Sequence, residues 1–345
     1  MFLRNAWYVA AWEDDISDGL LPVELLGDRI VLFRKSDGNY AALEDACPHR
    51  KLPLSMGRLK DDLVECGYHG LTFDCVGKCV LSPSSHAIPA GAQVRAYPAH
   101  ARYGLVWLWT GDANLADPSA IIDISEFESA AWGISRGKAM TVDCNYLYLV
   151  DNLLDPSHVA WVHQSSFGDG SSQNAPLKTV SNDSGVTVSR WIRDVDPAPF
   201  YAPFLQFHGR CDRKQQYEVR YPSNAVIRAI FTPSGTGGDD RMPDEREFLM
   251  DSYNFLTPVN ERQTRYFWFQ LRNFGPGDDA ISLQFATGVR DAFEEDRIIL
   301  NAVQKGMDEK QSPNIDLKID LGAFRFRRGL AARIDQEKLQ VATRG

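Results

Sequence analysis

Four side chains that commonly bind metals stand in two short, mixed pairs near the N-terminus. Cys47 and His49 lie in the segment CPHR, and Cys66 and His69 lie in the segment CGYH. Two separate loops can therefore each supply one thiolate and one imidazole. A [2Fe–2S] cluster can be held with both thiolates on one iron and both imidazoles on the other, and the neutral imidazoles raise its reduction potential. The spacing predicts a one-electron relay.

A tetrahedral zinc site is the alternative for these four ligands. Structural zinc sites usually pair like ligands at short spacings, two cysteines or two histidines together. Here each short pair is mixed, which favours the iron–sulfur cluster. Pro48 and Gly70 suit two tight loops whose backbone amides face the ligand sulfurs.

A second group of candidate ligands lies in the segment DNLLDPSHVAWVH, residues 151–163. His158 and His163 are five residues apart, so a regular α-helix would not align them on one face. Pro156 predicts a break in the helix, and such a break could turn both imidazoles inward. Two histidines with one carboxylate form the face that holds mononuclear Fe(II) and leaves positions open for O₂.

The carboxylate for this second site must come from elsewhere in the chain. The best donor is the segment AFEEDR near the C-terminal end, where three neighbouring carboxylates compete: Glu294, Glu295 and Asp296. We expect Asp296 to complete the site, the alternative being that the three acids form a solvated helix face.

The elements that must position these groups fall into two parts. Residues 1–112 show short apolar runs separated by turn residues, which predicts an all-β domain. Residues 113–345 begin in a turn-rich linker and continue with a helical stretch near 145–163, long alternating segments and a helical tail from about Ile281. This pattern predicts an antiparallel sheet with helices packed on it, so the whole chain is expected to be α+β.

Composition limits the possible functions. A chain of 345 residues favours two domains, and a formal net charge of −9 argues against nucleic-acid binding. No apolar run has the length of a membrane span, and the N-terminus does not resemble a signal peptide. Four of the six cysteines are scattered without a disulfide pattern, which suits a reducing cytoplasm; these are Cys75, Cys79, Cys144 and Cys211.

The motifs together resemble Rieske non-haem iron oxygenases. The resemblance rests on CPHR…CGYHG, on the N-x-x-D-x-x-H-x₄-H run and on the E-D motif of the C-terminal helix. The opening RNAWYVA, the DCNY…DNLLD stretch and RNFG at 272–275 are similar to the oxygenase components of vanillate O-demethylase and dicamba monooxygenase. This similarity implies an N-terminal Rieske [2Fe–2S] domain and a C-terminal helix-grip catalytic domain with mononuclear Fe(II). It also implies a head-to-tail homotrimer.

The resemblance further implies roles for particular residues. Asp155 would hydrogen-bond His158 and, in a neighbouring subunit, His69, giving the electron a short route. Asn152 would lie near the iron as a polar neighbour. Substrate contacts are expected at three positions: Arg228, Asn254 and Thr287. Arg228 could bind a substrate carboxylate through two hydrogen bonds, although a surface salt bridge is an equal alternative.

The implied activity is O₂-dependent O-demethylation or hydroxylation of an aromatic, carboxylated substrate. Electrons would come from NAD(P)H through a separate flavin- or ferredoxin-type reductase, because no dinucleotide-binding glycine motif occurs in this sequence. Two alternatives remain open at this point. One is a dioxygenase that cis-dihydroxylates a ring, and the other is a Rieske electron carrier without oxygenase activity.

Overall fold

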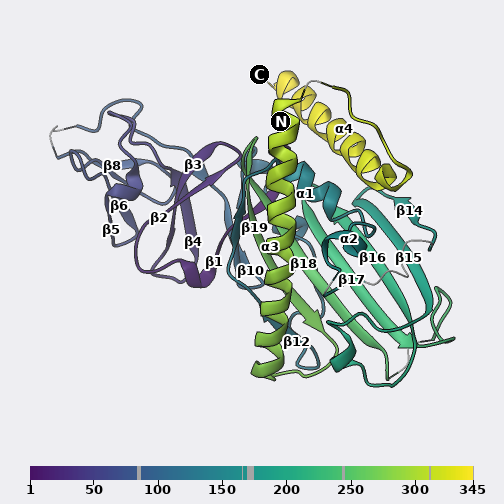
Figure 1. The fold of residues 1–345 in the computed structure, drawn as a ribbon. Coiled ribbons are helices and arrows are strands. Elements are labelled where there is room, and N and C mark those ends of the chain that lie inside the picture. The colour runs from purple at the N-terminus through teal and green to yellow at the C-terminus, as the bar shows by residue number, and fades with distance from the viewer. Residues whose placement is uncertain (84–86, 165, 169–174, 243–244, 311, 345) are drawn as a thin grey trace. The chain divides into compact units, whose positions relative to one another are not determined.

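The computed structural model describes residues 1–83, 87–164, 166–168, 175–242, 245–310 and 312–344 (Figure 1). The chain divides into two compact units, each with its own core. The first comprises Met1–Asp123 together with Thr257–Asn260, and the second comprises Ile124–Leu256 and Glu261–Gly345.

The first unit is built from short antiparallel strands, as the sequence predicts. Within the described residues they form the sheets β1-β11-β10, β2-β3-β4-β9 and β5-β6-β7-β8. Their bounds are β1 (Trp7–Trp12), β2 (Leu21–Leu25), β3 (Asp28–Arg34), β4 (Tyr40–Glu44), β5 (Arg58–Lys60), β6 (Leu63–Glu65), β7 (Thr72–Phe73), β8 (Cys79–Leu81), β9 (Ala96–Tyr97), β10 (Ala99–Arg102) and β11 (Leu105–Trp109). The turn-rich segment 111–121 packs on this unit, since Trp7 Nε1 donates to the carbonyl of Asp117 at 2.8 Å.

The second unit is organised around one large antiparallel sheet. Its strand order is β12-β19-β18-β17-β16-β15-β14, and β13 also pairs with β19. The strand bounds are β12 (Gly133–Arg136), β13 (Met140–Val142), β14 (Lys178–Ser181), β15 (Gly185–Val195), β16 (Cys211–Arg220), β17 (Asn224–Pro233), β18 (Phe248–Asn260) and β19 (Gln263–Arg272). The helices are α1 (Tyr146–Asn152), α2 (Val159–Val162), α3 (Asp279–Glu309) and α4 (Leu321–Arg344). The unit is thus the expected sheet with helices packed on it.

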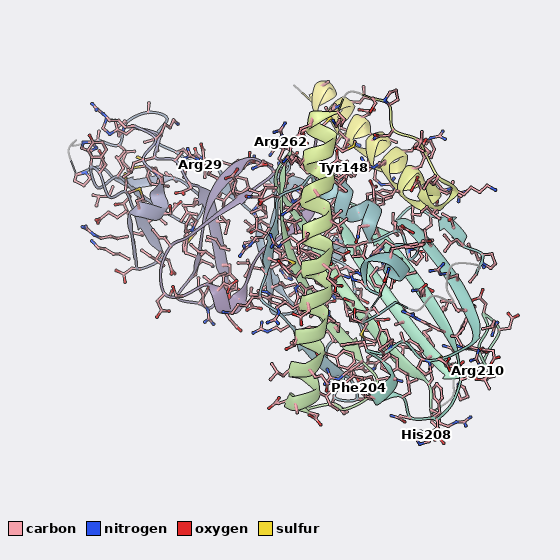
Figure 2. All side chains as sticks on the ribbon, viewed as in Figure 1. Arg29, Tyr148, Phe204, His208, Arg210 and Arg262 are labelled. Carbon is pink, nitrogen blue, oxygen red and sulfur yellow. The ribbon has the colours of Figure 1, made fainter. Side chains whose placement is uncertain are left out.

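The long helix α3 covers one face of this sheet (Figure 1). Asp278 caps its N-terminus, because the carboxylate accepts a hydrogen bond from the Ile281 amide at 3.0 Å. Its buried side chains recur every three or four residues, as an amphipathic helix on a sheet requires, and they include Phe285, Val289, Ala292 and Asp296. The ring of Phe204, labelled in Figure 2, lies 4.7 Å from that of Phe285.

The expected break in the helical stretch near residue 156 is present. α1 starts after Asn145, whose side chain accepts from the Leu147 amide at 3.0 Å, and it ends at Asn152. Pro156 lies in the turn that follows, and the short helix α2 begins at Val159. In the described part of the chain, no helix is both long enough and apolar enough to cross a lipid bilayer.

Candidate metal centres and substrate cavity

Two loops with the same backbone geometry carry the four predicted cluster ligands. In each loop the amide four residues after the cysteine donates to the cysteine carbonyl, Lys51 to Cys47 at 2.8 Å and Gly70 to Cys66 at 3.1 Å. Both donors have positive φ angles, 60° and 72°. Each cysteine amide also donates to the carbonyl five residues further on, at 2.9 and 2.8 Å. The chain therefore builds one ligand-presenting turn twice.

The fold sorts these ligands by kind. The thiols of Cys47 and Cys66 are buried next to one another, and burial together with the neighbouring thiol raises the pKa of Cys47. The rings of His49 and His69 are exposed, with centroids 4.7 Å apart. The pairs that are mixed in sequence thus become a sulfur pair and an imidazole pair in space. A [2Fe–2S] cluster with unlike ligands on its two irons requires this arrangement.

The same geometry argues against zinc at these positions. A tetrahedral zinc ion lies about 2.0–2.3 Å from each ligand, so the four ligand atoms would lie within about 4 Å of one another. Among the described residues, ligand atoms of three or more metal-binding side chains converge within 4.8 Å in one group, His158, His163 and Asp296. The four cluster ligands do not converge in this way, so they do not form a zinc site.

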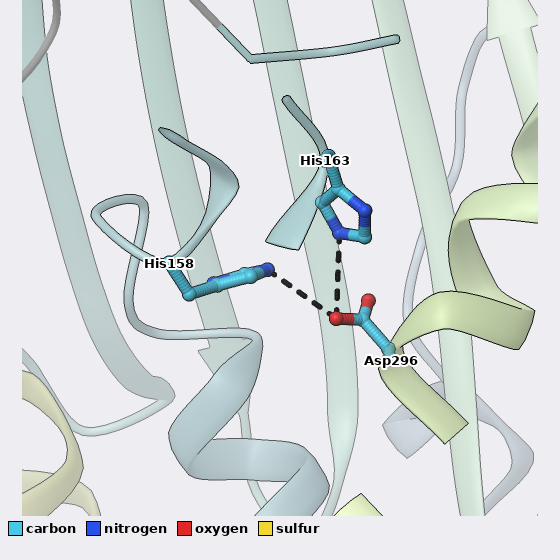
Figure 3. Close-up of side chains that lie close together, drawn as sticks. All are labelled: His158, His163 and Asp296. Atoms are coloured by element: carbon cyan, nitrogen blue, oxygen red, sulfur yellow. Dashed lines mark ion pairs between the residues drawn. The ribbon is translucent and has the colours of Figure 1, made fainter. Parts of the chain in front are cut away.

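That converging group consists of His158, His163 and Asp296 (Figure 3). Asp296 Oδ1 lies 3.6 Å from His158 Nε2 and 3.3 Å from His163 Nε2. The two histidines flank the short helix α2, and Asp296 projects from the buried face of α3. The break after α1 therefore turns both imidazoles toward one carboxylate.

Hydrogen bonds at the far side of each ring fix which nitrogen can bind a metal. His158 Nδ1 lies 2.5 Å from the carbonyl oxygen of Asp155, and His163 Nδ1 lies 2.6 Å from Glu295 Oε2. A carbonyl and a carboxylate can only accept, so each Nδ1 must donate. Both Nε2 lone pairs then face Asp296 Oδ1, which is also an acceptor. A cation at the centre resolves this convergence of acceptors, and the donor set suits divalent iron.

The electrostatics of the site agree with a bound cation. Burial by itself would lower the pKa of His163, but the carboxylates of Asp296 and Glu295 outweigh burial and hold that pKa above its usual value. The surroundings therefore favour positive charge at this point, whether it is carried by a proton or by a metal ion.

Asn152 and Asp155 both lie beside this site, and Asp155 reaches it through its main chain. Asn152 Nδ2 donates to Asp296 Oδ1 at 3.0 Å. Asp155 contacts His158 through its main-chain carbonyl and not through its carboxylate. The carboxylate instead accepts from the Ser157 amide at 2.7 Å, because it caps the turn after Pro156. A hydrogen bond between Asp155 and His158 is therefore present, with the main-chain carbonyl of Asp155 as its acceptor.

A small cavity of about 80 Å³ opens beside the three candidate iron ligands. Its walls are mainly apolar and aromatic and come from the sheet, from α3 and from the loop after α2. The polar side chains lining it, besides the three iron ligands, are Tyr201, Arg213, Tyr217 and Ser252. Burial raises the pKa of Tyr217 to about 12, so its hydroxyl stays neutral.

The three substrate contacts expected from sequence do not line this cavity. Arg228 lies on the opposite face of the sheet from its neighbour Ile227, which does line it, and pairs with Asp251 at 2.7 and 2.5 Å. Asn254 is fully buried and accepts from the Tyr266 hydroxyl at 2.9 Å. Thr287 is half-buried on α3.

A Rieske-type ligand arrangement in one unit and a His/His/carboxylate cluster on an antiparallel sheet in the other define the class of Rieske non-haem iron oxygenases. The model for the Rieske [2Fe-2S] domain matches residues 6–98, and the model for the vanillate O-demethylase oxygenase C-terminal domain matches residues 142–336. The chain belongs to the family of Rieske oxygenase components that includes vanillate O-demethylase.

Relatives extend the match over almost the whole chain. The toluene-4-sulfonate monooxygenase system iron-sulfur subunit of Comamonas testosteroni is 36% identical, covering 93% of this chain and 94% of the relative. The vanillate O-demethylase oxygenase subunit of a Pseudomonas strain is 34% identical, with coverages of 95% and 94%. A crystal structure of dicamba monooxygenase bound to 3,6-dichlorosalicylic acid has a TM-score of 0.89 and 32% identity, covering 99% of both chains. This protein is therefore an oxygen-incorporating oxidoreductase with a Rieske domain and a His/His/Asp iron site.

Proposed function

We propose that this protein is the terminal oxygenase of a multicomponent system that removes a methyl group from an aromatic methoxy substrate, or hydroxylates a closely related position. The observation that carries the proposal is the convergence of His158 Nε2, His163 Nε2 and Asp296 Oδ1 beside a mainly apolar cavity. Relatives named for vanillate and toluene-4-sulfonate support an aromatic acid as the substrate.

The protein's own groups divide the work between holding the metals and holding the substrate. Cys47, Cys66, His49 and His69 would hold the cluster, and His158, His163 and Asp296 would hold Fe(II). When bound, the two centres supply single electrons and the activation of O₂. Asn152 orients Asp296, and the carbonyl of Asp155 and the carboxylate of Glu295 hold the imidazoles in the metal-binding tautomer.

The chemistry of a methoxy substrate gives a product that can be measured directly. Insertion of one oxygen atom into a methyl C–H bond, with two electrons and two protons reducing the other atom of O₂ to water, yields a hemiacetal. The hemiacetal releases formaldehyde and leaves the phenol. The apolar walls exclude water from the reacting carbon and position the ring.

The reaction is tested by supplying a surrogate reductase and NADH to the purified protein with a panel of methoxylated aromatic acids. The reaction is run under ¹⁸O₂. The expected result is release of formaldehyde, with one atom of each O₂ entering the substrate and the other entering water. A cis-diol carrying two labelled atoms would establish the dioxygenase alternative. Reductase-dependent reduction of the cluster without any oxygenated product would support the electron-carrier alternative, which has no need of the His/His/Asp group.

We also propose that the chain works as a homotrimer in which electrons pass from one subunit's cluster to its neighbour's iron. Asp151, Asn152 and Asp155 line an open cleft on the second unit, so the residues beside the candidate iron site are accessible from outside. At this cleft the Asp155 carboxylate would accept a hydrogen bond from His69 of the neighbouring subunit. Asp155→Asn should keep both metals and lose coupled turnover. Normal turnover in that variant would refute a role for the Asp155 carboxylate in electron transfer between subunits.

The subunit crossing has a direct test. Cys66→Ser removes a cluster ligand and His163→Ala removes an iron ligand, so each variant alone should be inactive. If the two chains are unfolded together and refolded as mixed assemblies, activity should return, because one subunit keeps a cluster and its neighbour keeps an iron. No recovery in mixed assemblies of confirmed composition would place electron transfer within one chain.

A further inference from the structure

We infer that the hydroxyl of Tyr217 positions the substrate by donating a hydrogen bond to the ether oxygen next to the reacting methyl group. Tyr217 would thereby make the site select oxygen over carbon at that position of the substrate. The inference rests on the proposed function, because it concerns the same cavity.

Tyr217 belongs to a row of paired residues on the face of the sheet that lines the cavity. On β16 it pairs with Ile227 of β17, and Ile227 pairs with Ser252 of β18. All three side chains line the cavity. Neighbouring strands lie about 4.8 Å apart, so the row carries one hydroxyl on each side of an apolar side chain, about 10 Å apart at the backbone.

The two hydroxyls of this row differ in their hydrogen bonds. Ser252 Oγ accepts from Gln270 Nε2 at 3.1 Å and donates to Asn254 Oδ1 at 3.4 Å. Tyr217 is only 7% exposed, yet its hydroxyl has no hydrogen-bond partner among the described residues. It is also not one of the fully enclosed polar atoms that lack a partner, so it is accessible from the cavity. Its proton can therefore be donated to a ligand.

An unpartnered hydroxyl in the wall of a buried cavity favours a ligand that carries an acceptor. Buried polar groups are nearly always hydrogen-bonded, because burial without a partner costs free energy. A tyrosine hydroxyl has an ordinary pKa of about 10, so it is protonated at neutral pH and can act as the donor. A ligand oxygen would supply the partner that the protein does not.

Tyr217 lies at the end of the cavity where the iron ligands lie. Burial raises the pKa of Tyr217, and the nearby carboxylates of Asp155 and Asp296 raise it further. Tyr201 also lines the cavity, and burial raises its pKa too, but these two carboxylates do not act on it. The ring of Tyr201 lies instead 4.8 Å from that of Phe231 and 5.4 Å from that of Phe167. Of the two tyrosines, Tyr217 is the one beside the iron site.

The place of this donor determines which substituent of the substrate it meets. The reacting methyl group must lie beside the iron ligands, and the ether oxygen is one bond away from that carbon. A hydrogen bond from Tyr217 to this oxygen would hold the methyl group toward the iron site. An alkyl group of the same shape would leave the hydroxyl unpaired, and a site built to hydrogen-bond a substrate atom discriminates against an analogue that lacks this atom.

The test measures ligand affinities of the holoprotein by calorimetry, without reductase or O₂. The ligands are three matched pairs, the 2-, 3- and 4-methoxybenzoates and the corresponding ethylbenzoates, in which CH₂ replaces the ether oxygen. In at least one pair, Tyr217→Phe should weaken the methoxy member by about three- to tenfold, as expected for one neutral hydrogen bond. The affinity for its ethyl partner should change by less than about twofold.

Two further measurements separate recognition from a structural role. Tyr201→Phe removes the other tyrosine hydroxyl of the cavity and should leave the ratio of methoxy to ethyl affinity unchanged. Tyr217→Phe should keep the melting temperature of wild type, because the lost hydroxyl makes no hydrogen bond within the described part of the chain. A lower melting temperature would mean that the hydroxyl serves the fold, and it would contradict the inference.

An unchanged ratio in all three pairs for Tyr217→Phe, or the same change of ratio in Tyr201→Phe, would overturn the inference. So would a failure of wild type to bind any methoxybenzoate. Because binding is measured without turnover, a ratio that depends on Tyr217 without formaldehyde release would contradict the proposed reaction and leave the inference intact. Formaldehyde release with an unchanged ratio would support the reaction and refute the role of Tyr217.

Discussion

Asn152 and Asp296 lie 144 positions apart in the chain and are joined by a hydrogen bond of 3.0 Å from Asn152 Nδ2 to Asp296 Oδ1. The accepting oxygen is the one that faces both His158 Nε2 and His163 Nε2. One amide at the end of α1 therefore sets the direction of the carboxylate on α3.

Replacing Asn152 by alanine should weaken iron binding without disturbing the cluster. Groups that orient metal ligands typically contribute about 10–100-fold to metal affinity. We expect Asn152→Ala to lower the affinity for Fe(II), or for Co(II) as a spectroscopic probe, by that factor. The visible spectrum of the [2Fe–2S] cluster should be unchanged and reports on folding. An unchanged metal affinity would show that Asp296 is oriented by α3 alone.

Neighbouring glutamates on α3 offer a matched comparison. Glu295 accepts from His163 Nδ1 at 2.6 Å, whereas Glu294 accepts from Arg297 at 2.7 Å. Glu295→Ala should reduce metal affinity by about 10-fold or more, because the His163 tautomer is no longer fixed. Glu294→Ala should leave it unchanged. Equal losses of metal affinity in both variants would mean that the negative charge on α3 matters and that the hydrogen bond from His163 to Glu295 does not.

Loss of the cluster and loss of the mononuclear metal should be separable. The cysteine loops belong to the first compact unit and the His/His/Asp group belongs to the second. Cys66→Ser should eliminate acid-labile sulfide and the visible absorbance while the second unit still binds one Co(II) per chain. A variant that loses both metals would show that the two units do not fold independently.

Asp212 should stabilise the second unit in a pH-dependent way. This buried carboxylate accepts from the amides of Asp194, Gly235 and Gly237 at 2.9–3.0 Å and from Arg193 Nη1 at 3.1 Å. Burial acts to raise the pKa of Asp212, but these hydrogen bonds outweigh burial and lower it below the usual 3.8. The stabilisation is therefore present above about pH 4 and is lost as the pH falls through the lowered pKa.

Asp212→Asn tests that assignment by denaturant unfolding. At pH 7 the free energy of unfolding of the variant should be lower by about 2 kcal/mol, a typical contribution of hydrogen bonds to a charged group. The difference from wild type should narrow as the pH is lowered below about 4. Asp196→Asn, at a carboxylate whose side chain is 87% exposed, is the control and should change little. A difference that stays constant with pH would mean that Asp212 acts through packing.

The local sequence is enough to predict the two cluster loops, the two histidines of the iron site and the fold class. The loops CPHR and CGYH carry their ligands within four residues, so the turn itself brings cysteine and histidine together. Pro156 breaks the helix between Asn152 and His158 for a reason internal to the backbone. The alternating segments and the amphipathic tail predict the sheet and α3, because each pattern reflects burial on one face.

The tertiary structure decides what depends on distant partners. Which of three adjacent acids faces the histidines depends on the rotation of α3 on the sheet, and the helix turns Asp296 inward while Glu295 reaches His163 from the side. Which arginine enters the cavity depends on strand register, since a shift of one residue exchanges the two faces. Arg213 and Arg228 both lie in alternating strand segments, so the sequence does not distinguish them. Only the pairing of β16, β17 and β18 directs the first to the cavity and the second to Asp251.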